Sequence, residues 1–309
     1  RLPALPPDRA GAAPTGLLAD ARAGLGYIWS RPALRIIALG FCAVVAANGV
    51  DDVALVVLGT DDLHASDSAI ALMLAGVGVG WRPEISGWVA DRPGLRFGEV
   101  IAESIAPAVP PRGVVELRER GVEVVPHGIR LSLGGTDPLD PGKVTHLAAC
   151  AAALGSPVVS EHVAFCGAGG LTAGHLLPLP RTRAALDVLA ANVRRLQAEL
   201  DVPVALEPIA SFLDWPEDEF TEADFLTELL ERTGALLLLD VANVYANAVN
   251  RGRDPRTALD RMPLSRIAYV HIAGGAEHPD DPGIYHDTHA DPVPEPVFAL
   301  LGELVDRIG

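Results

Sequence analysis

From residue 76 onward, short apolar runs alternate with longer amphipathic stretches. The apolar runs have the length of strands and cover 76–80, 98–103, 122–127, 157–163, 202–207, 235–241 and 266–272. The amphipathic stretches carry apolar residues at helical spacing and cover 111–120, 141–154, 181–200, 221–233, 254–261 and 293–308. Alternation of this kind predicts βα units around a parallel sheet. The start signals at Asp140-Pro141 and Thr221 and the glycines at 121, 155 and 234 support these helix limits.

Several of the predicted strands end in side chains that bind metals. These residues are His127, His162, Glu207, Asp240 and His271. In a barrel of parallel strands the C-terminal ends meet at one face, where active sites lie. The pattern therefore predicts an α/β, TIM-like (β/α)8 barrel with a metal site at its mouth. Only seven strands can be counted before the chain stops at Gly309, so we expect a barrel that lacks its last strand.

Each candidate ligand has a plainer interpretation. Carboxylates in apolar runs, such as Glu207 and Asp240, are costly unless they are paired or bind a metal. A lone histidine such as His127 is structural about as often as it is a ligand. Because neighbouring strand residues face opposite sides, we expect His162 to point inward and Glu161 to support it. Asn243 either coordinates a metal or fixes a loop.

The most specific local motif is His286-Asp287-Thr288-His289. In an extended chain, residues 287 and 289 share one face and could grip one ion or a pair of ions. We take Asp240 and His289 as candidate catalytic residues. The full set of candidate metal ligands is His127, His162, Glu207, Asp240, Asn243, His271, Asp287 and His289.

This donor set is imidazole and carboxylate without thiolate, so a structural zinc site of the cysteine type is excluded. The set exceeds the needs of one ion and implies two or three. Iron, manganese and zinc all suit these donors, and the spacing does not choose between them.

Residues 1–75 differ from the rest. An uncharged run at 36–50 is shorter than the roughly 20 residues that cross a bilayer, so a membrane contact is expected only if 33–60 insert. The segment resembles a fragment of a major-facilitator transporter. We interpret it as a fusion remnant that packs little against a barrel at 76–309.

Composition narrows the class of protein. The net charge of −16 excludes a nucleic-acid binder that depends on a basic face. The three cysteines, Cys42, Cys150 and Cys166, form no CxxC motif and fit a reducing compartment. With no cleavable signal peptide recognisable, we expect a cytoplasmic protein.

Residues 76–309 resemble the DUF692 (UPF0276) family, the multinuclear non-haem iron-dependent oxidative enzymes. The matching words include Gly-Val-Gly-Val-Gly-Trp-Arg-Pro-Glu (76–84), Pro-His-Gly-Ile-Arg (126–130), Ser-Glu-His (160–162), Gly-His-Leu-Leu-Pro-Leu-Pro-Arg-Thr (174–182), Leu-Asp-Val-Ala-Asn (239–243), Val-His-Ile-Ala-Gly-Gly (270–275) and His-Asp-Thr-His (286–289). The resemblance implies a barrel holding two or three irons. It also implies oxidation, with dioxygen, of a ribosomally made precursor peptide, usually at cysteine, often with a small partner protein that binds the leader.

Two features depart from the family pattern. Pro208 stands where the family has an asparagine, and the last strand, which in the family carries a further carboxylate ligand, is absent. Two other functions therefore stay open: a divalent-metal sugar isomerase or phosphodiesterase, and an inactive truncated fusion. The only lysine, Lys143, falls on a predicted helix away from the mouth, which is unfavourable to the sugar isomerase.

Overall fold

The computed structural model describes residues 54–57, 76–278 and 283–308. The chain divides between Val50 and Asp51 into two units, and the first lies outside the described residues, as do the apolar run at 36–50 and His64. Among the described residues, none of the helices combines the length and apolar character that a membrane span requires.

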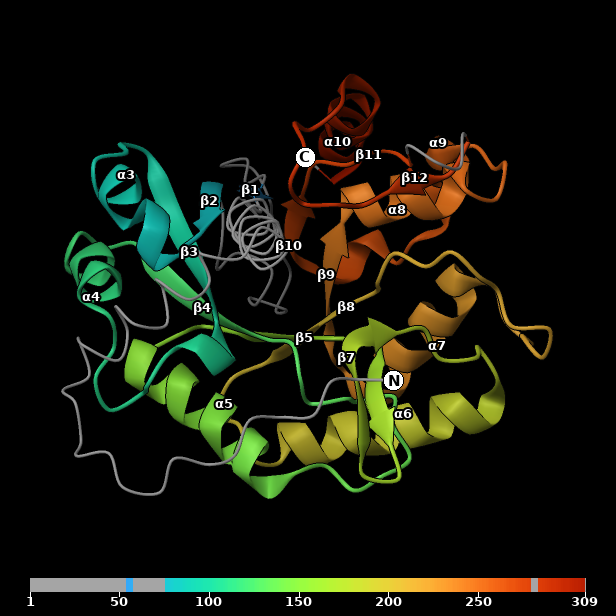
Figure 1. Ribbon diagram of the computed structural model, residues 1–309, viewed down its shortest axis with the longest axis horizontal. Helices are drawn as coiled ribbons and strands as arrows, with labels where there is room; N and C mark the ends of the chain where they lie inside the picture. Colours follow the sequence, from blue (N-terminus) through green and yellow to red (C-terminus); the bar gives the residue numbers. More distant parts are fainter. Residues whose placement is uncertain (1–53, 58–75, 279–282, 309) are drawn as a thin grey trace, which may run out of the picture. The chain divides into compact units, whose positions relative to one another are not determined.

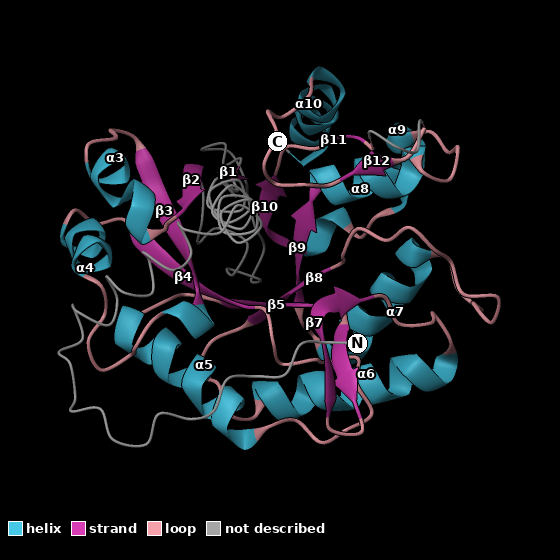
Figure 2. Cartoon of the chain, viewed as in Figure 1, coloured by secondary structure: helices cyan, strands magenta, loops and turns pink. Residues whose placement is uncertain are grey.

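Seven parallel strands form the sheet of the second unit, in the order in which the chain delivers them (Figures 1 and 2). They are β2 (Gly76–Gly80), β3 (Leu95–Ile101), β4 (Glu123–Gly128), β5 (Val159–His162), β8 (Val204–Glu207), β9 (Leu236–Asp240) and β10 (Ile267–Ile272). All seven overlap the strands predicted from the apolar runs. The predicted α/β barrel architecture is confirmed.

The gap expected between the last and the first strand is filled. Strand β1 (Ala54–Val57) pairs antiparallel with β10 on one side and with β2 on the other, which closes the barrel. Leu55 is the register partner of His271, and Val56 that of Val77. The two edges that the sequence leaves exposed are therefore paired, and an edge strand's free N–H and C=O groups favour such pairing. Residues 54–57 lie within the N-terminal segment that the sequence sets apart.

Helices flank the curved sheet on its outer side (Figure 1). The described helices include α3 (Ser86–Ala90), α4 (Arg112–Glu119), α5 (Pro141–Leu154), α6 (Arg183–Gln197), α7 (Glu222–Thr233), α8 (Val241–Val249), α9 (Pro255–Arg261) and α10 (Glu295–Ile308). Their limits follow local chemistry. The Asp140 side chain caps α5, Thr221 caps α7, and Gly234 ends α7 with a φ of 71°. Apolar side chains of these helices and of the outward strand positions form the main core.

Two short hairpins were not predicted from the sequence. Strands β6 (Phe165–Ala168) and β7 (Leu171–Leu177) follow β5, and β11 (Ala276–Glu277) pairs with β12 (Tyr285–His286) after β10. Both hairpins leave the C-terminal ends of barrel strands, so they lie on the same side of the barrel as the candidate ligands.

Candidate metal centre

The barrel interior has an apolar layer and, above it, a polar layer. The apolar layer is a separate buried cluster that includes Phe97, Val125, Val158, Ala205, Leu238 and Tyr269. Two residues further along each strand comes a buried polar side chain: Glu99, His127, Ser160, Glu207, Asp240 and His271. Because strand residues two apart share a face, the same inward stripe that fills the lower barrel delivers these groups to its C-terminal end.

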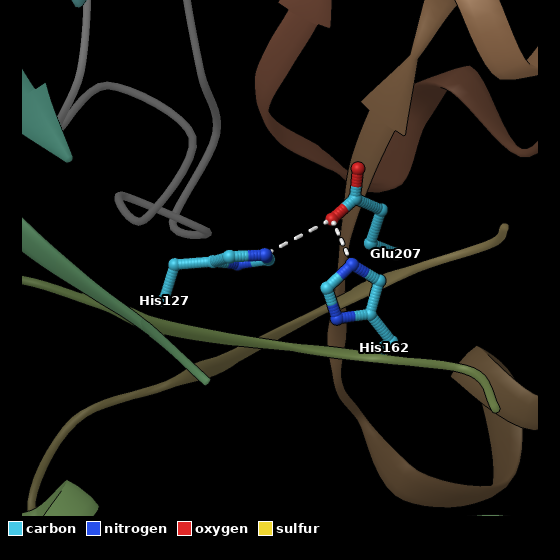
Figure 3. Close-up of side chains that lie close together, drawn as sticks. All are labelled: His127, His162 and Glu207. Carbon is cyan, nitrogen blue, oxygen red and sulfur yellow. Dashed lines mark ion pairs between the residues drawn. The ribbon is translucent and has the colours of Figure 1, made fainter. Parts of the chain in front are cut away.

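The first group of candidate ligands comes from β4, β5 and β8. The Nε2 atoms of His127 and His162 lie 3.5 Å and 3.2 Å from Oε2 of Glu207, and both rings point at this carboxylate (Figure 3). All three residues are buried. Ligand atoms of the three lie within 4.8 Å of one another, a separation that one ion could bridge.

Glu161 lies beside His162, with its Oε1 3.5 Å from Nδ1 of the His162 ring. The Glu161 carboxylate accepts hydrogen bonds from the backbone N–H groups of Leu131 and His162, at 3.1 Å and 2.9 Å. It therefore ties the loop after β4 to β5, while Nε2 of His162 faces Glu207.

The second group shares Glu207 with the first and adds Asp240 and His271. His271 Nδ1 lies 3.0 Å from Oε1 of Glu207. Asp240 ends β9 and also begins α8, because its Oδ1 accepts from the N–H groups of Ala242 and Asn243 at 2.7 Å and 3.0 Å. Its second oxygen, Oδ2, is left for another partner.

The third group shares Asp240 with the second and adds Asp287 and His289. These two do not lie on an extended strand as the sequence predicts. His289 has a φ of 55°, and its N–H donates to the carbonyl of Gly274, so the chain turns back and brings His289 Nε2 to 2.8 Å from Oδ2 of Asp287. The turn still places both side chains beside Asp240.

The three groups consist of histidines and carboxylates, and Asn243, an amide, lies three residues after Asp240 in the first turn of α8. Its Nδ2 donates to the carbonyl of Pro208 at 3.1 Å, which links α8 to the loop after β8. Pro208, which stands where the family has an asparagine, thus still binds the Asn243 side chain through its backbone carbonyl. The Asn243 Oδ1 is buried without a hydrogen-bond partner.

The electrostatics show that the site holds more negative charge than its histidines balance easily. Burial, together with the nearby Asp287, raises the pKa of Asp240 to about 6. Burial disfavours charge on His289, but the hydrogen bond to Asp287 raises its pKa to about 9. His271 behaves alike: burial lowers its pKa, yet Glu99 and Glu207 raise it well above its usual value. Asp240, His289 and His271 therefore hold their protons more tightly than usual, because carboxylates surround them. A bound metal cation would be favoured by the same negative charge.

The residues present fit bound cations. Among the residues that the structure describes, four buried carboxylate and amide oxygens have no hydrogen-bond partner: Glu207 Oε2, Asp240 Oδ2, Asn243 Oδ1 and Asp287 Oδ1. Glu207 Oε2 does face the two imidazoles of the first group, but outside hydrogen-bonding geometry. Buried polar atoms rarely lack partners, and oxygens beside imidazole nitrogens are a typical donor set for divalent first-row metals.

Three residues were not predicted from the sequence: Glu99 and Ser160 of the polar layer, and Tyr269, whose hydroxyl reaches that layer from the apolar one. Glu99 accepts from the Tyr269 hydroxyl at 2.7 Å and lies 3.1 Å from His271 Nε2, while Ser160 Oγ lies 2.8 Å from His127 Nδ1. Glu99 carries the same signal as Glu207, because it is a carboxylate inside the apolar run Phe97-Gly98-Glu99-Val100. Tyr269 and Ser160 carry no such signal.

His146 lies closer to the protein interior than its place on a predicted surface suggests. It is half-buried, and its Nε2 is 2.8 Å from the carbonyl oxygen of Ala102. A helix that packs against the end of β3 makes this contact available. His146 belongs to none of the three ligand groups found among the described residues.

Residues 76–309 match the family described as RiPP precursor modification enzyme MbnB/TglH/ChrH. A UPF0276 protein of Streptomyces avermitilis is 54% identical over 239 residues, which cover 75% of this chain and 48% of that protein. The chain thus spans about half the length of this relative. A UPF0276 protein of Anaeromyxobacter is 36% identical, over 78% of this chain and 85% of that protein.

Among solved structures, D-psicose 3-epimerase from Clostridium cellulolyticum H10 shares 11% identity and a TM-score of 0.47, over 74% of this chain and 78% of that one. L-ribulose 3-epimerase shares 18% identity and a TM-score of 0.47, over 73% and 71%. The match across 76–309 and the identity with the UPF0276 relatives establish that this chain belongs to the RiPP precursor modification enzyme MbnB/TglH/ChrH family.

Proposed function

We propose that this chain oxidises a ribosomally made precursor peptide at cysteine, using two or three iron ions and dioxygen. The observation that carries the proposal is the run of three ligand groups joined by shared carboxylates, Glu207 between the first two and Asp240 between the last two. Shared carboxylates are how a protein holds neighbouring cations, and the orphaned oxygens at these residues support that role. The family match supports a peptide substrate.

The residues would divide the work as follows. His127, His162 and Glu207 would hold one ion, Glu207, Asp240 and His271 a second, and Asp240, Asp287 and His289 a third. Iron, when bound, would bind the substrate thiolate and pass electrons from the cysteine to dioxygen. The second and third groups contain the two residues that we propose as catalytic, Asp240 and His289.

Burial decides how exposed each part of the centre is to a substrate. The side chains of His127, Glu207 and His271 are 8%, 3% and 2% exposed, whereas that of His289 is 26% exposed. A peptide would therefore approach from the side of His289. We propose that a small partner protein presents the peptide there.

The test uses the whole chain loaded anaerobically with Fe(II). The candidate substrates are cysteine-containing peptides translated from short reading frames that flank the chain's gene, each with and without cysteine replaced by serine. After dioxygen is added, we expect mass spectrometry to show an oxidised product only with the cysteine peptide, and none with His289→Ala. His146→Gln is the matched histidine control and should retain activity. Full iron occupancy with an unchanged peptide mass would contradict the proposal.

A further inference from the structure

Five buried side chains join into one hydrogen-bonded series across the barrel interior, which we call the Glu99 network. Its members come from β3, β4, β5 and β10, and in order they are His127, Ser160, Tyr269, Glu99 and His271. The successive distances are 2.8 Å from His127 Nδ1 to Ser160 Oγ, 2.6 Å to Tyr269 Oη, 2.7 Å to Glu99 Oε2 and 3.1 Å to His271 Nε2. Its two ends are candidate metal ligands.

The network is shut off from solvent. Ser160 and Tyr269 are fully buried, and Glu99 is 6% exposed. Below it lies the apolar layer, where the Tyr269 ring packs edge-on against Phe97 with a centroid distance of 5.9 Å. Water cannot easily replace a missing partner in such a place, so each hydrogen must go to a group within the network.

The direction of every hydrogen bond follows from the inventory of donors. An ionised carboxylate only accepts, so Glu99 Oε2 receives the Tyr269 hydroxyl hydrogen and the Nε2 hydrogen of His271. Two donors converge on Oε2 of Glu99, the Tyr269 hydroxyl at 2.7 Å and His271 Nε2 at 3.1 Å, as expected for a carboxylate that accepts from both. The Tyr269 hydroxyl has one hydrogen and donates it to Glu99, so its oxygen accepts the Ser160 hydroxyl hydrogen. The Ser160 oxygen then accepts from Nδ1–H of His127.

The two histidines thereby turn opposite nitrogens toward Glu207. His127 carries its hydrogen on Nδ1 and turns a bare Nε2 toward Glu207, 3.5 Å away. His271 donates through Nε2 and directs Nδ1 at Glu207, 3.0 Å away. A metal ligand's tautomer is set by the hydrogen bond of its other nitrogen.

We propose that Glu99 is a positioning residue which, through Tyr269 and Ser160, fixes the tautomers of both His127 and His271 for metal binding. The inference rests on the metal centre of the proposed function. It predicts that His127 binds through Nε2 and His271 through Nδ1. Neither Tyr269 nor Ser160 has any other evident reason to be polar in the barrel interior.

The experiment uses the whole chain with ¹⁵N-labelled histidine, and zinc as a diamagnetic probe. In the metal-free protein, long-range ¹H–¹⁵N spectra should show His127 as a single tautomer protonated at Nδ1. With zinc, the metal-shifted nitrogen should be Nε2 in His127 and Nδ1 in His271. Native His127 protonated at Nε2, or zinc on Nδ1 of His127, would overturn the proposal.

Three variants divide the network at known points. Tyr269→Phe and Ser160→Ala cut the His127 end, so His127 should become a mixture of tautomers while His271 is unchanged. Glu99→Gln removes the charge that orients both ends and should weaken zinc binding about 10- to 100-fold. Tyr245→Phe is the matched control, because Tyr245 is half-buried and packs against Tyr285 outside the network.

The outcomes separate two failures. If the unmodified chain binds no zinc, the metal centre is wrong, while the metal-free tautomer of His127 still decides the network. If the chain binds zinc but Tyr269→Phe matches Tyr245→Phe in tautomer and affinity, the network has no positioning role. Circular dichroism would confirm that each variant is folded, and Ser160→Ala gives the same answer with a smaller change in volume.

Discussion

At the scale of single residues, the shared carboxylates make the candidate ligands unequal. Glu207 belongs to two of the three groups, whereas His289 belongs to one. We expect Glu207→Ala to lower the metal count by about two ions per chain relative to the unmodified protein, and His289→Ala by about one. His146→Gln should leave the count unchanged. Metal analysis with native mass spectrometry measures these numbers.

Equal losses from Glu207→Ala and His289→Ala would mean that the three groups do not hold separate ions. Thermal unfolding of the metal-free variants guards against another explanation. A variant that loses metal but keeps the unfolding midpoint has lost ligands, whereas one that loses both has lost packing.

Some residues of the site could be predicted from the sequence, and others could not. Glu207 and Asp240 could be found because a charge in an apolar run is conspicuous, and the period of two then places it inside the barrel. Tyr269 could not be found, because an aromatic residue in a strand is the expected core residue and its hydroxyl partner, Glu99, lies 170 positions away. The turn at His289 was missed because loops have no periodicity to extrapolate.

At the scale of elements, helix α8 is built from the site itself. Asp240 caps its first turn, and Asn243 ties it to the loop after β8. Helix α8 begins directly after β9, at Val241, with no polar loop between them. It was therefore not predicted as a separate element from the sequence. The candidate ligand Asp240 therefore also caps the helix that follows its strand.

The loop between β8 and α7 is held by an ion-pair cluster around Asp214. Its carboxylate accepts from Nε of Arg251 at 2.9 Å and from Arg181 at 2.6 Å. The hydrogen bond from Arg251, followed by that from Arg181, lowers the pKa of Asp214 from 3.8 to about 2, although burial opposes this. This loop also carries Phe212, whose ring lies 4.7 Å from that of His286 beside the ligand motif.

Asp214 gives a prediction for acid stability. Because its folded pKa lies below its unfolded value, its contribution is complete above about pH 4 and is lost as the pH falls toward about 2. Asp214→Asn should therefore lower the free energy of unfolding at pH 6, and the difference from the unmodified chain should shrink to near zero by about pH 2. The effect will be small, since the side chain is 36% exposed. Urea unfolding of the metal-free proteins at several pH values tests this, and a difference that grows on acidification would contradict it.

At the scale of the whole molecule, the barrel consists of seven strands that the sequence predicts and one, β1, that it does not predict. Most of the parallel strands are predictable because they are short, largely apolar runs that are buried on both faces, as in β5, β8, β9 and β10. Strand β1 is not, because it runs antiparallel and is only four residues long, and it lies in a segment whose composition suggests a different origin. Strand β1 pairs where it does because β10 and β2 would otherwise be unpaired edges. Such edges are a property of the assembled sheet, and no local sequence pattern reveals them.

Closure by β1 can be tested with two truncations that differ only in this strand. A chain beginning at Asp51 keeps β1, and a chain beginning at Gly59 removes it, which leaves β10 and β2 as free edges. Since Leu55 pairs with His271, loss of β1 also removes the neighbour of a candidate ligand strand. We expect the shorter chain to unfold at lower temperature, to aggregate more readily through its free edges and to bind zinc more weakly than the chain from Asp51. Equal midpoints and affinities would show that β10 and β2 do not depend on this pairing in solution.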